Sequence, residues 1–231
     1  MRLATLYRKI FLNEKNPQGA KFFCVGLNKT GTTSLKNEFR RLHFKVGSQR
    51  QGELLFFEHY FKSEFRPILD FCKSAEFFQD LPFSCPETFK HLDQAFPSGK
   101  FILTIRDDPE QWYESLTQFH ARLFGTQGQP PTVAELEAAT YVKKGFMKRA
   151  IQLFGTSDSD PYNKKILVQF YINHVEAVKQ FFTNRTQKLL VLNLSSPHAY
   201  AEFQDFMNLR SPFDSFRWDN KTSNVSLRNK S

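Results

Sequence analysis

Residues 21–35 read Lys-Phe-Phe-Cys-Val-Gly-Leu-Asn-Lys-Thr-Gly-Thr-Thr-Ser-Leu, which has the pattern of a strand, a glycine-containing loop and the start of a helix. Its apolar first part, residues 21–26, predicts a buried strand, and the helical spacing of apolar side chains predicts a helix over residues 32–42. Between them, Gly26 and Gly31 have the Gly-x-x-x-x-Gly spacing of a phosphate-binding P-loop. Glycines let the backbone turn tightly, so that successive N–H groups and the helix N-terminus converge on a phosphate.

Short apolar runs alternate with helical patterns along the rest of the chain. Further strands are predicted at residues 75–80, 100–106 and 188–194. Further helices are predicted at residues 52–61, 86–96, from 109 onward, 132–154, 161–183 and 197–209. Strands that alternate with helices predict an α/β fold of three layers, in which helices flank a central parallel sheet.

The composition excludes several classes of protein. Of the 231 residues, 40% are hydrophobic and 24% are charged, which is ordinary globular usage and excludes wholesale disorder. No apolar run approaches the roughly 18–20 residues of a membrane-spanning helix, so no integral membrane segment is expected. Three cysteines make neither a disulfide framework nor a zinc motif, and with no secretory signal they favour a cytoplasmic location. The net charge of +9 favours a polyanionic ligand.

Ligands of such folds bind beyond the carboxyl ends of the strands. The search therefore narrows to the residues just after Gly26, Asp80, Arg106 and Leu194. The ATP-binding P-loop has lysine followed by serine or threonine directly after its second glycine. Here Thr32 and Thr33 occupy those positions, and the lysine, Lys29, precedes the glycine.

Two motifs resemble those of sulfotransferases that use 3′-phosphoadenylyl sulfate (PAPS). The run Lys-Thr-Gly-Thr-Thr-Ser at residues 29–34 resembles their 5′-phosphosulfate loop, although a Gly-Thr turn could also be a simple strand-to-helix connection. Residues 101–115 resemble their 3′-phosphate element: a strand, an Arg-Asp-Pro-like turn and a serine in the next helix. The family often separates this arginine and serine by eight positions, and here nine separate Arg106 from Ser115. Residues 80–82, Asp-Leu-Pro, and 220–222, Asn-Lys-Thr, are similar to segments of one subgroup.

The resemblance implies a P-loop nucleoside-triphosphate-hydrolase-like fold in one sulfotransferase domain over residues 1–231. Its core would span about 20–222, with residues 1–19 and 223–231 peripheral. It also implies transfer of a sulfuryl group from PAPS to a hydroxyl or amine of a small molecule or glycan, leaving adenosine 3′,5′-bisphosphate, with no metal. The residues expected to bind the donor are Lys29, Thr30, Gly31, Thr32, Thr33, Ser34, Arg106 and Ser115.

Two residues are assigned to catalysis. Lys29 is expected to neutralise charge on the bridging oxygen of the leaving phosphate. Asp80 is the leading candidate for the base that takes the acceptor's proton, with turn capping as its alternative role. His174 is a second candidate base, although its place beside a helical apolar stripe favours packing. Lys221 could fold over the nucleotide or belong to a solvated tail, and Arg106 could instead pair with a neighbouring aspartate.

Three other functions fit parts of the sequence. A P-loop kinase for a small molecule would need ATP, Mg²⁺ and the missing lysine after Gly31. A nucleic-acid-binding protein would suit the charge, but the basic residues are spread along the chain and no recognition motif is present, so no nucleic-acid partner is expected. A degenerate sulfotransferase would bind nucleotide without catalysis. The acceptor and the oligomeric state are left open by the sequence.

Overall fold

The structure is a computed structural model, and it describes residues 20–217. The chain forms two compact units, which are described separately. Among the described residues, the first unit contains 20–107 and 175–217, and the second contains 108–174. Within residues 20–217, no helix has both the length and the apolar character needed to cross a membrane.

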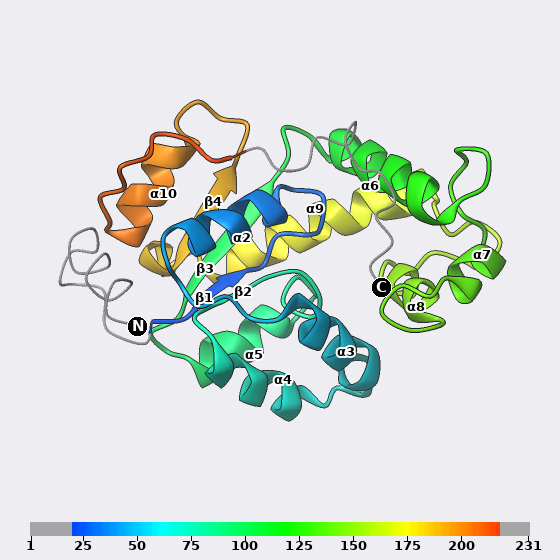
Figure 1. The fold of residues 1–231 in the computed structure, drawn as a ribbon, viewed down its shortest axis with the longest axis horizontal. Helices are drawn as coiled ribbons and strands as arrows, with labels where there is room; N and C mark the ends of the chain where they lie inside the picture. The colour runs from blue at the N-terminus through cyan, green and yellow to red at the C-terminus, as the bar shows by residue number, and fades with distance from the viewer. Residues whose placement is uncertain (1–19, 218–231) are drawn as a thin grey trace. The chain divides into compact units, whose positions relative to one another are not determined.

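The first unit is built on a four-stranded parallel sheet (Figure 1). Its strands are β1 (Phe22–Cys24), β2 (Phe77–Phe78), β3 (Lys100–Ile105) and β4 (Leu189–Asn193), in the order β2-β1-β3-β4. Each of the four strands lies inside a segment that the sequence predicts to be a strand. The parallel sheet flanked by helices confirms the predicted α/β fold class.

Helices α2 (Thr32–Arg41) and α10 (Ala199–Met207) pack on one face of the sheet. The Phe39 ring of α2 stacks on Phe77 of β2 with centroids 3.9 Å apart, and it meets Phe203 of α10 edge-on at 5.7 Å. Burying a phenylalanine contributes about 2–3 kcal/mol. This face therefore holds α2, and the loop that precedes it, firmly against β1.

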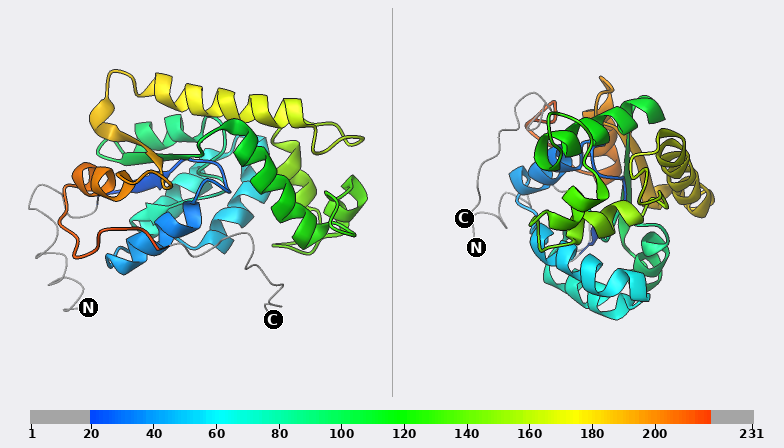
Figure 2. Two further views of the ribbon diagram at one scale, coloured as in Figure 1. Left: turned by 90° about the horizontal axis from the view of Figure 1, so that it is seen from above. Right: turned by 90° about the vertical axis from the view of Figure 1, so that its right-hand side faces the viewer.

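The other face is also aromatic. Helices α4 (Phe65–Phe71) and α5 (Thr88–Ala95) and the last turns of α9 (Lys164–Phe181) contribute to it, as the edge view in Figure 2 shows. Phe23 of β1 lies 5.4 Å from Phe101 of β3, whose ring lies 4.7 Å from Phe182. Helix α3 (Gln49–His59) begins at Ser48, whose hydroxyl accepts a hydrogen bond from the Gln51 N–H. Much of the high phenylalanine content is thus core.

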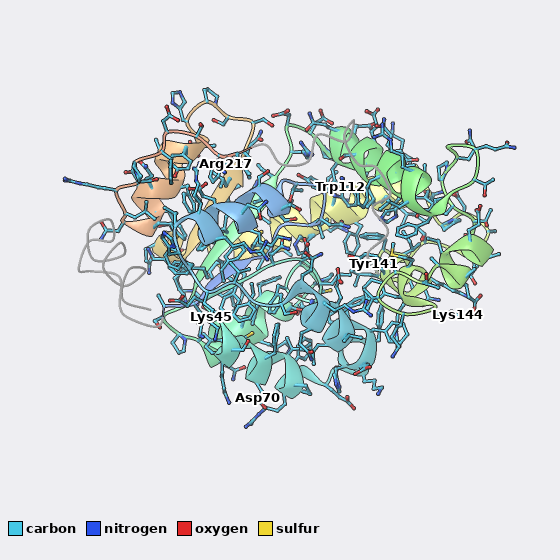
Figure 3. The ribbon with its side chains drawn as sticks, viewed as in Figure 1. Lys45, Asp70, Trp112, Tyr141, Lys144 and Arg217 are labelled. Atoms are coloured by element: carbon cyan, nitrogen blue, oxygen red, sulfur yellow. The ribbon has the colours of Figure 1, made fainter. Side chains whose placement is uncertain are left out.

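The second unit is helical. It contains α6 (Pro109–Phe124), α7 (Val133–Ala138), α8 (Phe146–Gln152) and the first turns of α9. Trp112, labelled in Figure 3, is fully buried and packs against Phe154 and Tyr171 with centroids 5.9 and 5.1 Å away. The start of α6 at Pro109 confirms the predicted start, because Asp108 caps the helix by accepting a hydrogen bond from the Gln111 N–H.

The prediction of one long helix over residues 132–154 is wrong. Helix α7 ends at Ala138 and α8 begins only at Phe146. Between them, Val142 and Gly145 have φ values of 58° and 79°, in the left-handed region that a right-handed helix cannot contain. Gly145 then serves as the N-cap of α8, so a glycine inside the apolar pattern marks a break.

Several short elements were not predicted as separate elements. Besides α4, these are the one-turn 3₁₀ helices η1 (Tyr60–Lys62), which overlaps the end of the helix predicted at 52–61, η2 (Cys72–Ser74) and η3 (Thr186–Lys188). The sequence of α4 contains Pro67, which discourages a helical prediction. A proline is tolerated here because it lies in the first turn, where its missing N–H would have had no partner within the helix.

Candidate functional site

The two glycines of the β1–α2 loop are required for different reasons. Gly26 lies against β3, and a Cβ added to it would lie only 2.1 Å from Thr104 Oγ1. Gly31 is the N-cap of α2 and has a φ of 97°, which favours glycine over any residue with a side chain. The predicted P-loop spacing thus corresponds to one close backbone approach and one left-handed turn.

The amino end of α2 faces the loop with its backbone donors. Among the residues that the structure describes, no side chain caps this end, and the first turn contains no acidic residue. The first N–H groups of a helix have no partner within the helix, and the helix dipole places partial positive charge there. The predicted phosphate-binding residues Thr32, Thr33 and Ser34 form this first turn, so their N–H groups suit an anion.

Thr30 anchors the loop to the sheet. Its hydroxyl lies 2.6 Å from Thr104 Oγ1 and donates a hydrogen bond to the Leu27 carbonyl. Both threonine side chains are buried. Thr30 is therefore placed to fix the shape of the loop, a role that the sequence alone did not suggest for it.

Lys29 and Arg106 come together at the carboxyl ends of β1 and β3. The Arg106 Nε donates a hydrogen bond of 2.7 Å to the Lys29 carbonyl oxygen. Lys29 has a φ of 69°, a left-handed conformation that is uncommon for a residue other than glycine. Because β1 and β3 are adjacent parallel strands, the backbone of Lys29 and the side chain of Arg106 lie together at their carboxyl ends.

The aspartates that follow Arg106 each accept a hydrogen bond that supports the fold. Asp107 accepts a hydrogen bond of 2.6 Å from the Asn193 side chain at the end of β4. Asp108 belongs to the second unit and caps α6. These contacts give each carboxylate a structural role in joining or starting elements.

Asp80 lies at the end of β2, beside the first turn of α2. Its Oδ1 accepts a hydrogen bond of 2.9 Å from the Thr32 hydroxyl, and its Oδ2 accepts one of 2.8 Å from the Gln79 side-chain amide. Asp80 has a φ of 58°, and a cis peptide bond joins Leu81 to Pro82 directly after it. The predicted base thus touches a residue of the predicted phosphate loop.

The surroundings of Asp80 alter its acidity. Burial raises the pKa of its carboxyl above the usual value, and the Thr32 hydroxyl, the Lys36 ammonium, the Gln79 amide and the Lys29 ammonium act in the opposite direction. A carboxyl with a raised pKa is a stronger base in its ionised form than an ordinary surface aspartate.

Three other predicted residues lie outside this group. Ser115 belongs to the second unit, where its Oγ is buried and makes no hydrogen bond with the residues that the structure describes. His174 is also in the second unit, where it is buried and its ring lies parallel to that of Phe170, 6.5 Å away. Lys221 lies outside the described residues.

Sequence reasoning missed the polar residues that support the site. Thr104 contacts Thr30. Gln79 contacts Asp80, and Gln49 in turn contacts Gln79. Thr104 could have been noticed, because it is a polar residue inside an otherwise apolar strand. Within residues 20–217, no group of three or more His, Cys, Asp or Glu side chains is arranged to hold a metal ion.

The chain matches the model of a known protein family. The model of a family described as a sulfotransferase domain matches residues 21–225, which includes described residues of both units. A search of curated proteins found no match to the chain.

Proposed function

Because the chain belongs to the sulfotransferase family, we propose that it transfers a sulfuryl group from PAPS to a hydroxyl or amine of a small molecule or glycan. The product of the donor would be adenosine 3′,5′-bisphosphate. The observation that carries this proposal is the contact between Arg106 and the Lys29 carbonyl, because it puts two cationic residues beside a helix N-terminus that no described side chain caps. Such an arrangement suits a ligand with several negative charges.

The described residues fit the 5′ end of this donor. The N–H groups of Thr32, Thr33 and Ser34 would bind the 5′-phosphate, and the left-handed Gly31 lets the backbone turn toward it. The Thr32 hydroxyl has only one hydrogen, and this hydrogen is donated to Asp80. We therefore assign to Thr32 a backbone contact with the phosphate and a side-chain contact with the base.

We assign the 3′-phosphate to Arg106, because a guanidinium binds a phosphate through parallel, charge-assisted hydrogen bonds. The role of Ser115, which belongs to the second unit, stays a prediction. In this role Arg106 would serve two purposes, because its Nε also holds the Lys29 carbonyl.

The chain's own part in the reaction is alignment and charge stabilisation. PAPS supplies the activated sulfuryl group. Lys29 would stabilise the charge that develops on the bridging oxygen, and Asp80 would take the proton of the attacking hydroxyl or amine. Each Asp80 oxygen accepts one hydrogen bond from a described residue, and each has a second lone pair with which to accept that proton.

A P-loop kinase is the second candidate, because Thr33 occupies the position of the Ser or Thr that helps to hold Mg²⁺ in P-loop enzymes that use ATP. However, Thr32 occupies the position where those enzymes have their phosphate-binding lysine.

Thermal unfolding with two ligands distinguishes the candidates. We expect adenosine 3′,5′-bisphosphate to raise the Tm, because a ligand at 100 times its Kd adds about 2.7 kcal/mol to folded-state stability. ATP with Mg²⁺ should raise it less. The reverse order would favour the kinase. Incubation with isotopically labelled PAPS and a panel of hydroxyl and amine acceptors would then test the transfer directly.

A further inference from the structure

A chain of side-chain amides leads from Asp80 into the protein. Gln79, which is only 5% exposed, directs its amide nitrogen to Asp80 Oδ2 at 2.8 Å and to Gln49 Oε1 at 3.3 Å. The same Gln49 oxygen accepts a hydrogen bond of 3.0 Å from Lys36 Nζ, and the Gln49 amide nitrogen donates one of 3.0 Å to Glu53. The end of β2 is thereby linked to α2 through Lys36 and to α3 through Gln49.

The geometry of Gln79 is unusual for a residue that only stabilises the fold. Its side-chain oxygen Oε1 is buried and has no hydrogen-bond partner among the described residues. An unsatisfied buried carbonyl is unfavourable, so a core position of this kind would ordinarily favour an apolar side chain. The two hydrogen bonds that the amide donates set its orientation, and one of them ends on the candidate base.

We propose that Gln79 is a positioning residue, which holds the Asp80 carboxylate against Thr32 and connects it through Gln49 to Lys36. The proposal rests on the proposed role of Asp80 as the base. With Oδ1 held by Thr32 and Oδ2 held by Gln79, rotation of the carboxylate would break both hydrogen bonds. The remaining lone pairs are thus kept in a fixed direction for the acceptor's proton.

The same contact sets the pH at which Asp80 becomes a base. A hydrogen bond donated to the carboxylate stabilises its charged form, so loss of the Gln79 amide should raise the pKa of Asp80. The ionisable groups around this carboxyl are Lys36 of α2, Lys29 of the loop and Cys24 of β1, with Glu53 of α3 at the far end of the amide chain. Both ammonium groups favour the charged carboxylate, and they remain in place when Gln79 is replaced.

The test is a titration of the Asp80 carboxyl by ¹³C NMR, with its signal assigned from Asp80→Asn. In Gln79→Met we expect the midpoint to rise by about one pH unit, which corresponds to the loss of one charge-assisted hydrogen bond. Gln49→Met, which keeps the Gln79–Asp80 bond, should give a smaller rise. The matched control is Gln51→Met in the same helix, because Gln51 is exposed, and it should leave the midpoint unchanged. An unchanged midpoint in Gln79→Met overturns the proposal.

The pH profile of kcat/KM separates this inference from the proposed function. If Asp80 is the base, Asp80→Asn removes the acid limb of the profile, and Gln79→Met should move that limb to higher pH by the same amount as the NMR midpoint. An acid limb that disappears in Asp80→Asn but stays in place in Gln79→Met overturns the positioning role alone. If the acid limb of the profile survives in Asp80→Asn, Asp80 is not the base, and Gln79 does not position a base.

A second variant keeps the test possible if the first one does not fold. If Gln79→Met does not fold, Gln79→Asn keeps an amide but shortens its reach, so it should raise the midpoint in the same direction. Retention of the wild-type midpoint in a folded Gln79→Asn protein, with circular dichroism as the check on folding, would also overturn the proposal.

Discussion

The two ends of the parallel sheet both carry basic side chains, but they use them differently. At the carboxyl ends of the strands, Lys29 and Arg106 lie beside a helix N-terminus that no described side chain caps. At the amino ends, Lys21 and Lys100 each donate a hydrogen bond to a backbone carbonyl, of Ala75 and of Phe206. Burial lowers the pKa of both of these lysines.

The amino ends also contain a cluster of ion pairs. Asp93 of α5 accepts hydrogen bonds from Arg185, the N-cap of η3, and from Lys188, the last residue of η3, just before β4. Burial alone would raise the pKa of Asp93, but the two cations outweigh burial and lower it. The basic side chains at this end are therefore bound by groups of the fold itself, namely one aspartate and backbone carbonyls.

The comparison shows that a basic side chain indicates a binding site only when other groups beside it can also bind an anion. The informative combination is a cation together with backbone donors that the fold leaves without partners. Net charge, which first pointed to a polyanionic ligand, includes the lysines of both ends and does not distinguish them. Four substitutions test this division.

Lys29→Ala should have the largest effect. We expect kcat for sulfuryl transfer to fall by about 100- to 1,000-fold, because the charge on the bridging oxygen loses its partner, while the Kd of adenosine 3′,5′-bisphosphate changes little. Steady-state kinetics and calorimetric titration measure the two quantities. Wild-type turnover in Lys29→Ala would contradict the catalytic role of Lys29 at the carboxyl ends of the strands.

Arg106→Gln should weaken nucleotide binding. Loss of a charge-assisted, bidentate contact predicts a Kd for adenosine 3′,5′-bisphosphate that is higher by about 100-fold, whereas adenosine 5′-phosphate, which lacks the 3′-phosphate, should bind almost as before. The control is Arg66→Gln on α4, whose exposed side chain pairs with Asp70; Asp70 is labelled in Figure 3. Equal losses for both nucleotides would show that Arg106 acts only through its bond to the Lys29 carbonyl.

Asp93→Asn should affect stability and not binding. Removing the charge that Arg185 and Lys188 share should lower the free energy of unfolding by about 2 kcal/mol at pH 7. Because the folded-state pKa of Asp93 is lowered, its contribution is complete above the unfolded pKa and is lost as the pH falls through the folded pKa.

The difference between wild type and Asp93→Asn should therefore shrink below about pH 4. Urea unfolding at several pH values measures this difference. A changed Kd for adenosine 3′,5′-bisphosphate in Asp93→Asn would contradict the separation of the two ends.

Lys100→Met should have the smallest effect. The variant loses a hydrogen bond to the Phe206 carbonyl but no longer buries a charge, so the free energy of unfolding at pH 7 should change by less than about 1 kcal/mol. Because burial lowers the pKa of Lys100, wild type should gain stability relative to the variant as the pH rises toward about 10. A loss of turnover comparable with that of Lys29→Ala would show that the amino ends of the strands also contribute to the reaction, and would contradict the difference between the two ends.

The fold was largely predictable because its signals are local. Each strand is a short apolar run, and α6 begins at the proline where the sequence places it. The family was also predictable, because the motifs at residues 29–34 and 101–115 lie in the chain that the sulfotransferase model matches. Residues 132–154 misled the prediction because Gly145 breaks a pattern that is otherwise helical.

The site was predictable only in part. Loops after parallel strands meet at one edge, so the nearness of Lys29, Asp80 and Arg106 follows from topology. The hydrogen bonds of Thr32 to Asp80 and of Gln79 to Gln49 depend on side-chain rotamers and on where α2 and α3 lie in the fold. No spacing in the sequence encodes those contacts.

The contacts that fix the first loop have a consequence for the entropy change of ligand binding. Gly26 fits against Thr104 with no room for a Cβ, and the Thr30 hydroxyl lies against the same threonine. These contacts come from the sheet itself and need no nucleotide to form them. A phosphate arriving from solution would meet a preorganised cradle, so little conformational entropy would be lost on association.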